Sequence, residues 1–152
     1  MNADDPAAGV RLEWVASEVT LPLRQQVLRP RLTVADVVFP GDDAPDTAHV
    51  VAVLPDGTVV GTATTMREAA PWGAAGWRLR GMATEETVRD RGIGSRLLTA
   101  VIDHVRGDGG GLLWCNARVR AIPFYERGGL RTRGERWVDP NIGPHIVMWR
   151  II

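Results

Sequence analysis

Two arginines and two glycines are clustered in the segment Arg89-Asp-Arg-Gly-Ile-Gly94. Apolar residues recur at helical spacing over residues 93–105, which predicts an amphipathic helix that begins at this cluster. The first turn of a helix has unpaired backbone N–H groups and the positive end of the helix dipole, so it can hold a pyrophosphate. The glycines permit close approach and the arginines add charged donors. The expected chemistry is therefore binding of a phosphate-bearing ligand.

The spacing of this motif alone does not identify the ligand. A glycine-rich turn without any ligand would have the same pattern. A dinucleotide site is disfavoured, because the third glycine of that fingerprint is missing and no acidic residue ends a suitable next strand.

Several side chains could transfer protons. Tyr125, the only tyrosine, lies on an expected short helix and could act as a general acid or simply pack in the core. A base could be provided by Glu85 or His145, although an exposed carboxylate and a strand-edge histidine both have ordinary structural roles. Glu68 and Glu86 are further candidates. Cys115 lies in an apolar run that predicts a buried, inert thiol.

The elements that must position these residues form one α+β domain with a single strand-helix-strand crossover. The first nine residues are expected to be a frayed tail. Turn-forming residues make a loop with three carboxylates at Asp42, Asp43 and Asp46. Strands are predicted over residues 10–16, 48–54, 58–66, 77–83, 112–115, 133–138 and 145–152, and helices over 20–28, 93–107 and 121–127.

Composition excludes several classes of function. The 152 residues have 18 basic and 18 acidic side chains, so we expect no nucleic-acid or membrane partner. All the basic residues are arginine, which excludes a P-loop and a pyridoxal Schiff base. The dispersed histidines, of which His49 and His104 are expected at the surface, do not predict a metal site. Short apolar runs and an acidic N-terminus predict a cytoplasmic protein.

Two motifs at the proper spacing resemble the GNAT superfamily of acetyltransferases. Arg89-x-x-Gly92-x-Gly94 after Leu79-Arg-Gly-Met-Ala-Thr84 is similar to the acyl-CoA-binding motif of that family. Leu113-Trp-Cys-Asn-Ala117 with Ala121-Ile-Pro-Phe-Tyr-Glu-Arg-Gly-Gly-Leu130 is similar to its following motif. The resemblance extends from about residue 48 to the C-terminus. It implies a mixed, mostly antiparallel sheet of six to seven strands flanked by about four helices.

The resemblance further implies an N-acetyltransferase that uses acetyl-CoA and an amine acceptor, without a metal. Tyr125 would protonate the coenzyme A thiolate, and the backbone N–H of Met82 would stabilise the oxyanion. The coenzyme would contact Met82, Ala83, Thr84, Arg89, Asp90, Arg91, Gly92, Ile93, Gly94, Ser95, Asn116 and Tyr125.

The acceptor stays open at this point, with a small molecule favoured over a protein. The acidic loop would suit a cationic acceptor if it reached the site, although a solvated loop is the simpler explanation. Trp72 and Trp77 could line an acceptor pocket. The alternatives are an acyl-CoA-binding sensor of the same fold without catalysis, and a plain ligand-binding or interaction module. A homodimer is compatible with the pattern.

Overall fold

The computed structural model describes residues 4–152, which form a seven-stranded sheet with the strand order β1-β2-β3-β4-β5-β7-β6. All neighbouring strands are antiparallel except β4 and β5, which run parallel. The strands are β1 (Arg11–Val15), β2 (Ala48–Val53), β3 (Val59–Arg67), β4 (Trp77–Thr84), β5 (Leu112–Arg118), β6 (Arg131–Asp139) and β7 (Gly143–Ile151). The expected α+β class and strand count are confirmed.

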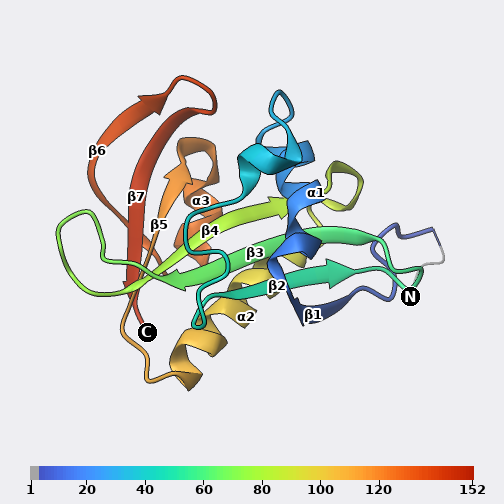
Figure 1. The fold of residues 1–152 in the computed structure, drawn as a ribbon, viewed down its shortest axis with the longest axis horizontal. Coiled ribbons are helices and arrows are strands. Elements are labelled where there is room, and N and C mark those ends of the chain that lie inside the picture. The colour runs from blue at the N-terminus through green and yellow to red at the C-terminus, as the bar shows by residue number, and fades with distance from the viewer. Residues whose placement is uncertain (1–3) are drawn as a thin grey trace.

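Three α-helices flank the sheet, fewer than the expected four. They are α1 (Leu21–Leu23), α2 (Ile93–Gly107) and α3 (Ile122–Arg127), supplemented by short 3-10 and π turns. Residues 17–28, here called the N-terminal helical segment, change from 3-10 to α to π geometry along their length. This segment lies in front of the sheet in Figure 1, whereas α2 and α3 lie behind it.

The two faces of β4 have opposite character because strand side chains alternate. Trp77 and Leu79 are buried in the same apolar core as the inward face of α2. Arg78 and Arg80 point to the opposite face, which the N-terminal helical segment partly covers. The sheet therefore has an apolar face toward α2 and an arginine-bearing face in its centre.

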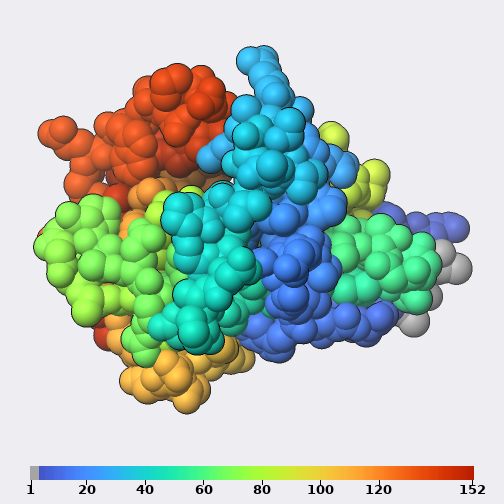
Figure 2. Space-filling model, viewed as in Figure 1, coloured from blue at the N-terminus to red at the C-terminus, as the bar shows by residue number. Residues whose placement is uncertain are grey.

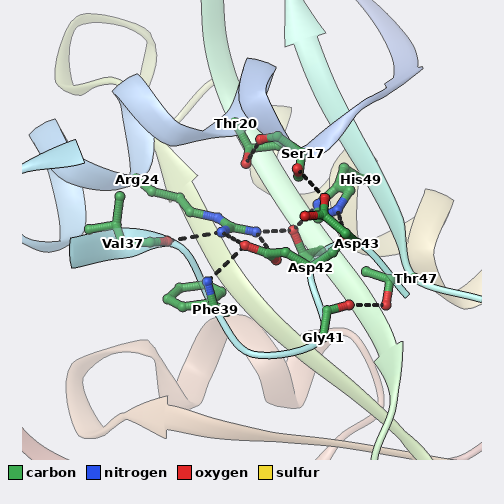
Figure 3. Close-up of polar contacts among 11 residues, drawn as sticks. Ser17, Thr20, Arg24, Val37, Phe39, Gly41, Asp42, Asp43, Thr47 and His49 are labelled. Carbon is green, nitrogen blue, oxygen red and sulfur yellow. Dashed lines mark hydrogen bonds and ion pairs between the residues drawn. The ribbon is translucent and has the colours of Figure 1, made fainter. Parts of the chain in front are cut away.

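The acidic loop is solvated only in part, because Asp43 and Asp46 are exposed but Asp42 is not, and none of the three lines the cavity described below. Asp42 is buried and accepts two hydrogen bonds from the Arg24 guanidinium, at 2.7 and 2.9 Å (Figure 3). His49, expected at the surface, is also buried and bonds the Thr64 hydroxyl at 2.7 Å and the Asp42 carbonyl at 2.9 Å. Buried charges require partners, so this network ties the N-terminal helical segment to the loop and to β3.

The N-terminal tail was expected to be frayed, but residues 4–9 pack onto the body. Ala7 is buried in the main core, and its N–H donates to Asp5 at 2.9 Å. Residues 1–3 lie outside the described part of the chain. Among the residues described, no helix is long and apolar enough to span a bilayer.

Candidate active site

A cavity opens where β4 and β5 diverge. The two strands pair only at Trp77 with Leu113 and at Arg78 with Trp114. Beyond this point they separate, and both strands contribute to the lining of a cavity of about 990 Å³. A gap between parallel neighbours in mid-sheet exposes backbone groups that the ladder would otherwise pair.

β4 carries a bulge at the edge of this cavity. Thr62 pairs with Ala83 and Thr64 pairs with Arg80, so Gly81 and Met82 together lie opposite one residue of β3. Gly81 has a φ of 65°, a left-handed conformation that favours glycine. Bulges redirect backbone groups and are common beside functional sites. Both bulge residues line the cavity.

The turn before α2 forms one end of the cavity. Gly92 precedes the helix with a φ of 80°, and no side chain caps the first helical turn in the part of the chain described. A Cβ at Gly94 would lie 3.2 Å from the Phe124 ring, so only glycine fits there without displacement. The Arg89 Nε donates to the Thr84 carbonyl at 3.1 Å, which holds this arginine beside the end of β4. These features fit a phosphate-bearing ligand.

The structure brings together nearly all of the residues expected to contact a coenzyme. Arg91 is the exception, because it does not line the cavity and instead pairs with Asp5 at 3.0 Å. The lining residues from that set are Met82, Ala83, Thr84, Arg89, Asp90, Gly92, Ile93, Gly94, Ser95, Asn116 and Tyr125.

Tyr125 and Cys115 line the cavity from α3 and β5. Burial, followed by the neighbouring Cys115, raises the pKa of the Tyr125 hydroxyl well above its usual value. That hydroxyl makes no hydrogen bond to residues 4–152 and is not sealed in the core. Burial also raises the pKa of the Cys115 thiol to about 12. Tyr125 is thus a protonated donor without an internal partner, and Cys115 is an un-ionised thiol.

The two candidate bases lie in different places. His145 lines the cavity, and its Nδ1 is 2.7 Å from the Gly143 carbonyl. Glu85 does not line the cavity; its carboxylate accepts from the backbone N–H and the hydroxyl of Thr87 at a 3-10 turn. Glu68 is held by Arg78 at 2.8 Å. His145 alone among these three faces the cavity without another acid–base partner in the described chain.

Sequence reasoning missed the far end of the cavity. Neither Trp72 nor Trp77 lines it: Trp72 packs against Trp149, and Trp77 is fully buried beside His104. The tryptophan that lines it is Trp137, stacked on His145 with ring centroids 5.7 Å apart. The other residues there that were not expected are Leu28, Arg29, Phe39, Arg78, Arg80, Arg118 and Ile142. The one sequence signal for these residues was the alternation of Arg78 and Arg80 along β4, which places both arginines on the same face of the strand.

Comparisons with known proteins agree with this geometry. The model of the acetyltransferase (GNAT) family matches residues 17–129. The chain is 32% identical over 145 residues to the uncharacterized N-acetyltransferase YitI of Bacillus subtilis, covering 94% of this chain and 97% of that protein.

Two solved structures show the same fold. A putative N-acetyltransferase from Lactobacillus plantarum has a TM-score of 0.74 at 24% identity, covering 93% of this chain and 97% of that one. An aminoglycoside 6'-N-acetyltransferase complexed with coenzyme A has a TM-score of 0.71 at 18% identity, covering 93% and 96%.

Proposed function

The chain belongs to the GNAT acetyltransferase family and is an acyltransferase, and from this premise we propose that it transfers the acetyl group of acetyl-CoA directly to a primary amine of a small molecule. The observation that carries the proposal is the cavity between β4 and β5, where the phosphate-binding turn, the β4 bulge and the free Tyr125 hydroxyl meet. Acetyl-CoA supplies an activated acyl group with a thiolate leaving group.

The turn at residues 89–94 holds the phosphates of the coenzyme in this proposal. The first turn of α2, whose N–H groups no side chain caps in the described chain, and the Arg89 guanidinium in the cavity lining can both bind an anion. The edge of β4 from Met82 to Thr84 pairs with the pantetheine arm, and Asn116 of β5 closes the opposite side. Arg91 contributes charge at the rim only, because Asp5 already binds it.

The bulge in β4 supports a role for Met82 in stabilising negative charge on the carbonyl oxygen. A bulged residue is displaced from the regular ladder, and the cavity lies beside it. A backbone N–H preorganised at this position is worth most in the transition state, because it need not reorient when the charge develops.

Tyr125 acts as the general acid in this proposal. Burial raises the pKa of this hydroxyl above its usual value, which is already well above neutral pH, so the hydroxyl is protonated and holds a proton for the departing thiolate. The lack of a hydrogen-bond acceptor for it among residues 4–152 leaves that proton free to be donated.

His145 is the better of the two candidate bases. A carbonyl oxygen can only accept, so the contact to Gly143 places the proton on Nδ1 and leaves the Nε2 lone pair free. An alkyl ammonium has a pKa of about 10.4, so a proton must be removed before attack. Stacking on Trp137 fixes the ring at the acceptor end.

The acceptor end of the cavity has two walls, which favour a small acceptor over a protein. Leu28 and Phe39 lie on one side, and Trp137 and Ile142 of the β6–β7 hairpin lie on the other. Figure 2 shows the hairpin, in red, beside the blue and light-blue atoms of the N-terminal residues.

The proposal is tested by calorimetric titration with acetyl-CoA, followed by a panel of amines assayed by thiol release. Arg89→Ala and Gly92→Glu should abolish micromolar binding. Gly57→Glu is the matched control, because Gly57 also has positive φ and open space but is remote from the cavity. Failure of the folded wild type to bind would refute the proposal.

Turnover separates an enzyme from a sensor of the same fold. Tyr125→Phe should lower kcat by roughly a hundredfold or more, because it removes a general acid, while leaving the KM for acetyl-CoA nearly unchanged. Binding of acetyl-CoA without turnover of any amine would favour the non-catalytic alternative. An unchanged kcat in Tyr125→Phe would remove the tyrosine from the mechanism.

A further inference from the structure

The lining of the cavity carries an excess of positive charge. The whole cavity is lined by the arginines Arg29, Arg78, Arg80, Arg89, Arg118, Arg120 and Arg127, but only by the carboxylates of Asp90 and Asp139. Among the described residues, Arg78 is the only one of these arginines with an ion-pair partner, Glu68. Arg29, Arg80 and Arg118 are partly buried without an ion-pair partner in the described chain, and a buried charge requires a partner.

Arg80 is the clearest of these unpaired cations. Its Nε is fully buried without a hydrogen-bond partner, and its guanidinium makes no ion pair to residues 4–152. The Phe39 ring lies 3.8 Å from the guanidinium carbon and holds it in place. Burial, followed by the charge of Arg78, lowers the pKa of Arg80 to about 10, so the group is still charged at neutral pH. Its terminal nitrogens make no hydrogen bond to the described residues, and the side chain lines the cavity.

Arg118 lies across the opening on β5. It pairs with His145 in the register of β5 and β7, so both side chains occupy the same face of the sheet. One of its terminal nitrogens donates to the Leu28 carbonyl at 3.2 Å, and it has no carboxylate partner in the described chain. Burial and the neighbouring Arg120 lower its pKa. A second oriented guanidinium therefore lies beside the candidate base.

The phosphates of the coenzyme do not account for Arg80. The phosphate-binding turn is adjacent to Thr84, because a Cβ at Gly94 would lie 3.9 Å from the Thr84 hydroxyl. Arg80 precedes Thr84 by four residues, which places it roughly 13 Å away along the strand. Arg80 also lies on the opposite side of the bulge. Its natural ligand is therefore a different anion.

We propose that the acceptor is a small amine that also carries an oxyanion, a carboxylate or a phosphate, which Arg80 and Arg118 bind. This inference rests on the proposed function and names the substrate class of the same site. Guanidinium groups bind both oxyanions through paired N–H donors. A polycationic acceptor such as an aminoglycoside would be repelled by the same arginines.

The charge arrangement also assists the chemistry. Nearby cations disfavour the ammonium form of the bound acceptor and lower the pKa of its amine. The same cations repel the ammonium group and so weaken binding of the acceptor. The attraction between the oxyanion and the arginines offsets this repulsion, so the acceptor can bind tightly and still lose its proton. An amine without an oxyanion would be repelled by the arginines with no offsetting attraction, and would therefore bind weakly.

The test is a comparison of matched acceptors in the thiol-release assay at saturating acetyl-CoA. The panel contains the common α-amino acids with their decarboxylated amines, 2-aminoethyl phosphate with ethanolamine, and an aminoglycoside. We expect kcat/KM to be at least tenfold higher for the oxyanion-bearing member of a pair, because only that member forms charge-assisted hydrogen bonds with the arginines. The amino acid and phosphate arms identify which oxyanion is bound.

Variants assign the effect to the arginines. Arg80→Gln and Arg118→Gln should raise the KM for the oxyanion-bearing amine at least tenfold, leave the KM for acetyl-CoA unchanged and remove the preference within a pair. Arg80→Lys should restore part of the preference, because it keeps the charge. Arg106→Gln, on the exposed side of α2 and paired with Asp103, is the control. Thermal unfolding confirms that each variant is folded.

Two results would show that the acceptor does not carry an oxyanion bound by the arginines, while leaving the proposed acetyl transfer intact. One is equal turnover of both members of every pair, or a preference for the amine without an oxyanion or for the aminoglycoside. The other is intact acetyl-CoA binding with turnover confined to amines that lack an oxyanion. Loss of acetyl-CoA binding in the wild type would instead refute the proposed function itself.

Discussion

Cys115 and Tyr125 are two ionisable groups at the same cavity wall, and burial raises the pKa of each. The consequences differ because their chemistry differs. A tyrosine with a raised pKa keeps its proton at neutral pH, whereas a thiol with a raised pKa loses the thiolate that makes cysteine reactive. The environment therefore leaves Tyr125 protonated, as the proposed general acid must be, and excludes Cys115 as a nucleophile.

The inertness of Cys115 can be measured directly. With a pKa of about 12, its thiol is almost entirely protonated at pH 8, and only 3% of the residue is exposed. We expect Ellman's reagent to react at least a hundredfold more slowly with the native protein than with the protein in guanidinium chloride, where the thiol has an ordinary pKa of about 8.5. Saturating acetyl-CoA should slow native labelling further. Fast native labelling at pH 8 would show that the thiol is accessible.

The ion pair between Arg24 and Asp42 links the N-terminal helical segment to the loop before β2. Burial alone would raise the pKa of Asp42, but hydrogen bonds from Arg24 and from the Phe39 N–H outweigh it and lower the pKa. A depressed native pKa contributes stability that is present above the unfolded value of about 3.9 and is lost as pH falls below it.

Asp42→Asn should therefore be strongly destabilising. It leaves the buried Arg24 without its counter-charge, which typically costs about 3–5 kcal/mol in the free energy of unfolding. Urea denaturation at pH 7 measures this cost. Asp43→Asn is the matched control, because Asp43 accepts a single hydrogen bond from Ser17 and should lose about 1 kcal/mol. A loss of under 1 kcal/mol in Asp42→Asn would contradict the structure.

The β4 bulge depends on Gly81 in two ways. Its φ of 65° disfavours a side chain, and a Cβ would lie 3.0 Å from the Arg24 Nε and 3.2 Å from the Phe39 ring. Gly81→Ala should lower the free energy of unfolding more than Gly57→Ala does, because at Gly57 φ is also positive but nothing lies within 4 Å. We expect about 1–2 kcal/mol for Gly57→Ala from the backbone alone, and a larger loss together with reduced kcat for Gly81→Ala. If urea denaturation gave the same loss in the free energy of unfolding for both variants, the neighbours of Gly81 would accommodate a Cβ without an additional cost.

The elements were predictable where the sequence pattern is local. Alternation located β4 to within a residue, and the apolar spacing of α2 gave the whole helix from Ile93 to Gly107. The short run predicted at residues 112–115 extends to Arg118, because pairing with β7 continues the strand past its apolar part. The mixed geometry of the N-terminal helical segment and the burial of Asp42 depend on contacts between distant segments, which no local pattern encodes.

The same distinction separates the two halves of the site at the scale of the molecule. The proposed donor half was visible in the sequence because residues 82–95 are contiguous and run from strand to turn to helix. The proposed acceptor half is assembled from residues of separate segments of the chain, namely Leu28, Phe39, Arg80, Arg118 and Trp137. Its charge could be recognised only after the fold had brought these residues together.

Binding of the donor should stabilise the whole molecule, because the cavity contacts α2, α3, β4, β5 and the β6–β7 hairpin at once. A ligand at one hundred times its Kd adds about 2.7 kcal/mol to the free energy of unfolding. For a domain of this size each kcal/mol corresponds to roughly 2–4 °C, so acetyl-CoA should raise Tm by roughly 5–10 °C. Scanning calorimetry measures this shift.

Variants of the two halves of the cavity should respond differently in that experiment. Arg89→Ala should lose most of the shift at the same acetyl-CoA concentration, because its guanidinium lies beside the phosphate-binding turn. Arg80→Gln should keep the shift produced by acetyl-CoA but lose any additional shift that an oxyanion-bearing amine produces with coenzyme A present. If Arg80→Gln and Arg89→Ala lost the acetyl-CoA shift equally, Arg80 would belong to the donor half, and the division of the cavity into a phosphate end and an acceptor end would be wrong.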